Sequence, residues 1–276
     1  MYLGISSPLE HASPSEWAAR HRALGLKTVV FPVCCLDSEE TISAYKKAAD
    51  DAGLGIAEVG VWRNTLAADP AERRKWIEYA AGQLRMADDI GAACCVNVVG
   101  TPYGPRWDGG YRDNFSGELW TMAVKMIREI IDCVKPRHAK FCIESMPWMI
   151  PDSPQACLRL LEDVDRPEFG THLDVVNMIT SPRRYFYNDD FLRECFSVLK
   201  GTICSCHLKD IRLKEEYTFQ LEETACGSGS LDLELYAGLA NVENRDMPMI
   251  IEHLSCDEEY LASVEYVKNR LKDYLS

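Results

Sequence analysis

Short apolar runs and longer amphipathic segments alternate along the whole chain. Continuous apolar runs of a few residues are typical of strands that are buried on both faces of a parallel sheet. On this pattern we predict eight strands, at Tyr2–Ser6, Thr28–Val33, Leu54–Val59, Ala92–Val99, Lys140–Ser145, Phe169–Asp174, Thr202–Leu208 and Met247–Glu252.

The amphipathic segments carry the start and stop signals of helices. Ser13 precedes a segment with Pro14 at its first position, and Gly53 and Gly91 follow the ends of two others; these are common cap residues. We predict helices at Pro14–Leu24, Ser38–Ala52, Asp69–Ile90, Ser116–Val134, Pro154–Val164, Asp189–Leu199, Leu231–Ala240 and Asp257–Leu275. Strand–helix units in alternation, without a linker between them, predict an α/β fold: a single (β/α)8 TIM barrel domain over residues 1–276.

Length and charge agree with that fold and narrow the range of partners. The 276 residues are close to the roughly 250 of a typical barrel of this kind. A formal net charge of −13 argues against a basic surface that binds nucleic-acid phosphates, so we expect no nucleic-acid partner. No apolar run approaches the roughly 18 residues that span a bilayer, so we expect no membrane partner. The first residues lack the features of a signal peptide and several cysteines fall inside predicted strands, so we expect free thiols in a reducing cytoplasm.

Four of the predicted strands lead into residues that can bind a metal. Glu144, Asp174, His207 and Glu252 stand at or next to the carboxyl ends of their strands. In a parallel barrel these ends lie together on one face, where active sites form. Three carboxylates and one imidazole, without a thiolate, favour Mn²⁺, Mg²⁺ or Co²⁺, with Zn²⁺ as an alternative. We therefore expect one divalent metal ion in this place, with manganese as the first choice.

These strand ends resemble those of the sugar (phosphate) isomerase/epimerases among the xylose isomerase-like TIM barrels, the group that includes ketose 3-epimerases. The resemblance covers nearly the whole chain. It rests on Cys-Ile-Glu-Ser at Glu144, His-Leu-Asp at Asp174, His-Leu-Lys-Asp at His207 and Ile-Ile-Glu-His at Glu252, and it is supported by the glycine loop Cys226–Asp232.

The resemblance implies a metal-dependent isomerase or epimerase of a small sugar, sugar phosphate or polyol ketone. Glu144, Asp174, His207 and Glu252 would bind the cation, which would polarise the substrate's carbonyl and make the adjacent C–H acidic. Glu144 and Glu252 would also exchange the proton on opposite faces of an enediolate, as inversion at that carbon requires. Barrels of this kind often pair, so we also expect a homodimer.

The chain departs from the epimerase pattern in two places. Asn177 stands where those enzymes usually have a His, three residues after the strand-end Asp, and Arg212, the nearest match to an expected Arg, stands at a different spacing. Lys209 could replace that Arg in gripping a hydroxyl, carboxylate or phosphate. The substrate contacts that we predict are Glu58, His172, Asn177, Lys209 and Trp107.

Some of these residues have an alternative role. Glu58 and His172 could instead support a neighbouring metal ligand, and Trp107 could cap the barrel mouth. His253 alternates away from Glu252, so we expect it to be structural.

Other functions fit the same ligands. A lyase or dehydratase acting on an inositol-type ketone or an oxidised C-glycoside would begin with the same proton abstraction. A non-catalytic barrel would bind a sugar or a partner protein, although a binding-only descendant has no need to keep all the ligands. A DNA-repair endonuclease group shares the barrel but uses three zinc ions and extra histidines. This chain has only 6 histidines and an acidic net charge, and both argue against a nuclease function.

Overall fold

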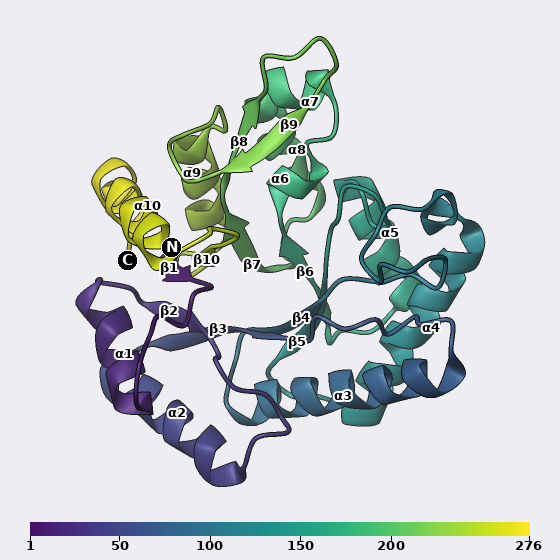
Figure 1. The fold of residues 1–276 in the computed structure, drawn as a ribbon, viewed down its shortest axis with the longest axis horizontal. Coiled ribbons are helices and arrows are strands. Elements are labelled where there is room, and N and C mark those ends of the chain that lie inside the picture. The colour runs from purple at the N-terminus through teal and green to yellow at the C-terminus, as the bar shows by residue number, and fades with distance from the viewer.

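The computed structural model describes residues 1–276, and a barrel of eight parallel strands forms its centre (Figure 1). The strands are β1 (Tyr2–Ile5), β2 (Thr28–Val30), β3 (Gly55–Gly60), β4 (Cys94–Asn97), β5 (Lys140–Glu144), β6 (Phe169–Leu173), β7 (Ile203–Leu208) and β10 (Pro248–Ile251). Their order in the sheet is β1-β10-β7-β6-β5-β4-β3-β2. The Lys27 amide donates to the Leu3 carbonyl at 3.1 Å, so β1 and β2 come together and nearly close the barrel. This arrangement confirms the predicted (β/α)8 TIM barrel.

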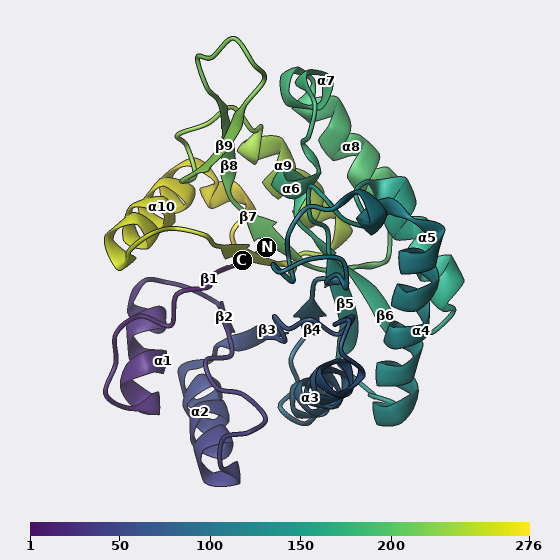
Figure 2. The same ribbon diagram turned by 45° about the vertical axis from the view of Figure 1, so that its right-hand side comes forward.

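Helices follow the barrel strands and surround them (Figure 2). The side chains of Ser13, Ser38 and Asp69 cap α1, α2 and α3 by accepting hydrogen bonds from backbone amides of their first turns. No helix is both long and apolar enough to cross a membrane. The long helices are α1 (Pro14–Ala23), α2 (Glu39–Ala52), α3 (Pro70–Asp89), α4 (Gly117–Val134), α5 (Pro154–Val164), α8 (Asn188–Val198), α9 (Leu233–Glu243) and α10 (Asp257–Arg270), and the short ones are η1 (Arg112–Phe115), α6 (Val175–Met178), α7 (Pro182–Phe186) and η2 (Lys272–Tyr274).

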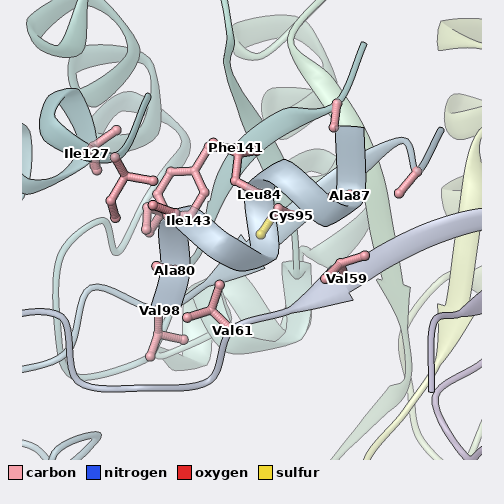
Figure 3. Close-up of a cluster of buried hydrophobic side chains, with 14 of the residues drawn as sticks. Val59, Val61, Ala80, Leu84, Ala87, Cys95, Val98, Ile127, Phe141 and Ile143 are labelled. Atoms are coloured by element: carbon pink, nitrogen blue, oxygen red, sulfur yellow. The ribbon is translucent and has the colours of Figure 1, made fainter. Parts of the chain in front are cut away.

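Buried apolar side chains fix the helices to the outside of the barrel. Figure 3 shows part of this layer, where Ala80, Leu84 and Ala87 of α3 lie beside Cys95 of β4 and Phe141 of β5. All five side chains are fully buried. Burying a side chain such as Leu or Phe stabilises the fold by roughly 1.5–3 kcal/mol. This layer anchors the helices to the strands, and a smaller apolar cluster of Cys94, Val96 and Cys142 lies apart from it.

Strand ends differ slightly from the predictions. β2 stops at Val30 rather than Val33, because Pro32 lacks an N–H group that could continue the ladder. β4 covers only Cys94–Asn97 of the predicted 92–99 segment. Every predicted strand and helix is present, so these errors concern boundaries alone.

A hairpin occupies the segment between β7 and α9, where we predicted no strand. β8 (Asp210–Leu213) pairs antiparallel with β9 (Leu221–Thr224), and the two strands extend away from the barrel (Figure 1). The Leu213 amide donates to the Tyr185 hydroxyl at 3.1 Å, which ties the hairpin to α7. The sequence pattern did not reveal the hairpin because its strands are short and rich in charged residues, which hides their alternation.

Asp210 organises the glycine loop that follows the hairpin. Its carboxylate accepts hydrogen bonds from the amides of Ile211 (2.8 Å), Gly227 (3.1 Å), Gly229 (2.9 Å) and Leu231 (2.9 Å). Gly227 has φ +87°, which glycine adopts without strain, and a Cβ on Gly229 would collide with the Asp210 carboxylate. The glycine loop is therefore a cradle for a carboxylate of this chain.

We expect Asp210→Asn to lower the free energy of unfolding by about 3 kcal/mol, because an amide cannot accept all of these hydrogen bonds and its NH₂ group faces backbone donors. Urea denaturation followed by circular dichroism would measure the loss. Asp232→Asn is the matched control, since Asp232 caps α9 and Asn caps helices equally well. A loss below about 1 kcal/mol for Asp210→Asn would contradict the proposed cradle.

Candidate metal centre

Side chains from four neighbouring strands meet at the carboxyl end of the barrel. Glu144 ends β5, Asp174 follows β6, His207 lies in β7 and Glu252 follows β10. One potential ligand atom of each lies within 4.8 Å of the others. His207 Nδ1 is 2.8 Å from Glu252 Oε1, 3.3 Å from Glu144 Oε1 and 3.7 Å from Asp174 Oδ2. The structure thus brings together the residues that the sequence predicted as metal ligands, and we call them the ligand cluster.

Strand geometry and local hydrogen bonds place these side chains. Residues two apart share one face of a strand, so Ser205 and His207 both point into the barrel. Asp174 caps the short helix α6, which fixes its carboxylate directly after β6. The buried Tyr236 hydroxyl lies 3.1 Å from the carbonyl oxygens of Leu173 and His207, so it links β6 to β7 beside the cluster.

Glu58 and His172 lie behind His207, in the barrel interior. Glu58 Oε2 is 3.5 Å from His207 Nε2, and Glu58 Oε1 is 3.4 Å from His172 Nδ1. His172 Nδ1 also contacts Ser205 Oγ at 2.6 Å, and its ring meets the His207 ring edge to face with centroids 4.0 Å apart. Glu58 and His172 are at most 2% exposed. The structure therefore surrounds these two predicted substrate contacts with protein, and Glu58 is placed to orient the His207 imidazole.

Lys209 lies on another side of the cluster. Its Nζ is 2.7 Å from both Asp174 Oδ2 and Glu252 Oε1, and 2.9 Å from the carboxylate of Glu223 on β9. His253 Nδ1 is 3.0 Å from Glu223 Oε1 and 3.3 Å from Lys209 Nζ. Lys209 is only 1% exposed, so carboxylates rather than water balance its charge.

The other predicted contacts lie in different surroundings. Asn177 Nδ2 donates to Glu144 Oε1 at 3.0 Å, so this residue touches the cluster directly. Trp107 lies in the β4–α4 loop, half-buried against the hydrophobic core. Arg212 pairs with Glu222 at 3.2 Å, and both side chains are exposed, so the hairpin turns this arginine toward solvent.

Sequence reasoning missed the contacts that Glu223 and His253 make with Lys209. Glu223 lies in a segment where we predicted no strand, and the structure places it in the short strand β9. His253 was expected to be structural because it alternates away from Glu252. A positive φ of 57° breaks that alternation, and His253 contacts Lys209 instead.

Charges within the cluster shift pKa values in opposite directions. Burial raises the pKa of the Glu144 carboxyl to about 7, with a further rise from the nearby Glu252 carboxylate. Burial alone would also raise the pKa of Glu252, but the His207 and Lys209 cations lower it to about 2. Burial acts to lower the pKa of His207, yet the Glu252 and Glu144 carboxylates raise it well above its ordinary value. The cluster thus pairs a carboxyl that holds a proton near neutral pH with one that stays ionised.

The donor set fits one divalent cation. Glu144, Asp174 and Glu252 supply oxygen, His207 supplies nitrogen, and no thiolate takes part, which is a set that suits Mn²⁺, Mg²⁺, Co²⁺ or Zn²⁺. The ring nitrogen of His207 that faces away from the cluster contacts the Glu58 carboxylate. Metal-binding histidines commonly have such a carboxylate partner, which fixes the ring orientation.

Similarity to known proteins agrees with this fold. The family model of the xylose isomerase-like TIM barrels matches residues 18–270. The chain therefore belongs to the xylose isomerase-like TIM barrel family. No curated protein sequence matches it.

Solved structures of similar fold cover almost the full length. D-psicose 3-epimerase, determined in the presence of D-fructose, superposes with a TM-score of 0.72 at 14% identity, over 98% of this chain and 99% of the other. L-ribulose 3-epimerase has a TM-score of 0.71 at 16% identity, covering 99% and 95%. A xylose isomerase-like TIM barrel protein from Mycobacterium smegmatis, in complex with magnesium, has a TM-score of 0.71 at 16% identity, covering 100% and 97%. At such identities these likenesses establish the fold.

Proposed function

We propose that this protein is a divalent-metal-dependent isomerase or epimerase of a small sugar, sugar phosphate or polyol ketone. The observation that supports it most directly is the ligand cluster: three carboxylates and a histidine from four neighbouring strands, at the end of the barrel where such enzymes build their active sites. The neighbours by fold include enzymes named as D-psicose and L-ribulose 3-epimerases. Manganese is our first choice of cation, and magnesium, cobalt and zinc are the alternatives.

Glu144, Asp174, His207 and Glu252 would hold the cation. When bound, it supplies Lewis-acid polarisation of a carbonyl group. Glu144 and Glu252 come from β5 and β10, with β6 and β7 between them, so their carboxylates approach from different sides. One carboxylate can take a proton from the carbon beside the carbonyl and the other can return a proton on the opposite face, which inverts that carbon.

Asn177 and Lys209 each contact one of these two carboxylates and affect its position or its ionisation. Asn177 donates to Glu144 Oε1 and fixes that oxygen, in the place where the epimerases usually have a His. Lys209 contacts Glu252 Oε1 and helps keep that carboxylate ionised. We infer that Asn177 positions a base and does not itself move a proton, because an amide does not titrate near neutral pH.

The direct test is proton exchange. Protein loaded with Mn²⁺ would be incubated in heavy water with a panel of free ketoses, ketose phosphates and inosose-type ketones, and deuterium uptake would be followed by NMR. We expect exchange at the carbon beside the carbonyl of at least one substrate, with appearance of its epimer or isomer. Loss of water instead would favour the lyase alternative. The absence of both exchange and bound cation would contradict the proposed function.

Cation affinity should rise with pH through the neutral range. Glu144, with its pKa near 7, and His207, with its pKa raised, both hold protons at neutral pH. A cation must displace these protons, so affinity increases by up to about tenfold per pH unit below pH 7 for each proton released. Glu252 adds nothing there, because its pKa of about 2 leaves it ionised throughout. Mn²⁺ titrations at pH 6, 7 and 8 would measure the trend, and equal affinities would rule it out.

A further inference from the structure

One side chain of the β8–β9 hairpin, Glu223, contacts two residues that lie beside the ligand cluster. Its Oε2 is 2.9 Å from Lys209 Nζ, and its Oε1 is 3.0 Å from His253 Nδ1. The adjacent residue Glu222 points the other way and pairs with Arg212 at 3.2 Å. Side chains next to each other on a strand face opposite sides, so the hairpin presents one carboxylate to the cluster and one to solvent.

Lys209 links that hairpin to the cluster. Its Nζ lies 2.7 Å from Asp174 Oδ2 and 2.7 Å from Glu252 Oε1, two of the four proposed ligands. With 1% exposure, this ammonium group is screened little by water. Its charge therefore acts strongly on any other charge among the same carboxylates, and Glu223 is the one partner outside the ligand cluster whose carboxylate offsets it.

We propose that Glu223 is a positioning residue of the metal centre, which acts through Lys209 and sets the affinity for the divalent cation. This inference rests on the proposed function, since it needs a cation in the ligand cluster. Lys209 repels the cation and competes for the oxygens of Asp174 and Glu252. Glu223 draws the ammonium group toward the hairpin and offsets its charge, so that these oxygens are more available to the cation.

Replacing one or the other partner of the Glu223–Lys209 ion pair should change the Mn²⁺ affinity in opposite directions. Glu223→Gln leaves the Lys209 charge less balanced, so Mn²⁺ affinity should fall by about three- to tenfold. Lys209→Met removes the competing cation, so Mn²⁺ affinity should rise by about tenfold. In the Lys209→Met background, Glu223→Gln should weaken binding by less than about twofold, because its route to the cluster is gone. A residue that merely supports the hairpin would not produce this pattern.

The experiment titrates Mn²⁺ into wild-type protein and each variant, and electron paramagnetic resonance measures the concentration of free Mn²⁺ at each step. Glu222→Gln is the matched control: it makes the same substitution on the neighbouring residue of β9 and should leave affinity unchanged. Thermal melts would establish that each variant is folded. Glu223 is about a third exposed (31%), so its replacement by Gln should be tolerated.

The possible outcomes distinguish failure of the Glu223 inference from failure of the proposed function. Wild-type protein that binds Mn²⁺, with Glu223→Gln and Lys209→Met changing affinity in opposite directions, would support the inference. Wild-type protein that binds Mn²⁺ while Glu223→Gln matches Glu222→Gln would overturn the inference alone. Weaker binding by folded Lys209→Met would also overturn it. Wild-type protein that binds no divalent cation would overturn both the inference and the proposed function.

Discussion

Glu144→Gln and Glu252→Gln are each expected to slow interconversion of the two epimers by about 10³-fold, because a positioned general base contributes 10²–10⁴-fold and Gln cannot accept a proton. Gln keeps the shape of the side chain, and in Glu144→Gln the carbonyl oxygen can still accept the hydrogen bond from Asn177. The loss should therefore appear in kcat, measured with Mn²⁺ and substrate at saturation.

Isotope exchange gives this prediction a sharper form. If each glutamate serves one face of the substrate, a single variant keeps the base for the other face. Each variant should then still exchange the proton of one epimer with heavy water without inverting it, and the two variants should do so for opposite epimers. Glu78→Gln, at an exposed position of α3, is the control and should behave as wild type. Loss of exchange for both epimers in either variant would show that the glutamates do not act as separate bases.

The sequence was sufficient for the barrel because its signals are local and repeated. Apolar runs such as Ala92–Val99 and cap residues such as Ser13 act within a few neighbouring positions, and every predicted unit is present. The β8–β9 hairpin was not found, because Asp210–Leu213 is short and half charged. Its stability depends on partners distant in sequence, Tyr185 on α7 among them, which no local pattern reveals.

The ligand cluster could be predicted for a similar reason, and its surroundings could not. Strand ends of a parallel barrel converge whatever the side chains are, so Glu144 and His207 were bound to meet. The place of Glu58 depends on depth within the barrel: it comes from β3 and meets His207 across the interior. Whether such a side chain faces substrate or another protein group is set by strand register and tilt, which the residue types do not encode.

His207→Ala is expected to have the largest effect on cation binding. His207 contributes the only nitrogen of the ligand cluster, and its Nδ1 lies within 3.7 Å of all three carboxylates. Its loss should weaken Mn²⁺ binding by at least about 10³-fold, beyond the 10–100-fold typical of losing a partner that only orients a ligand. It should also cost about 3 kcal/mol of folding free energy, because the buried Glu58 carboxylate loses one of the two imidazoles that face it.

Comparing Mn²⁺ affinity across three variants would distinguish a metal ligand from a residue that only orients a ligand. Glu58→Gln keeps the His207 ligand but weakens its orientation, so Mn²⁺ affinity should fall by about 10–100-fold. His253→Ala removes a histidine that is 56% exposed and outside the ligand cluster, so affinity should stay within about threefold of wild type. Elemental analysis and Mn²⁺ titration of the three variants would establish the order. If His207→Ala retained one cation per chain, the imidazole would not be a ligand, and the site would have to be sought among the carboxylates alone.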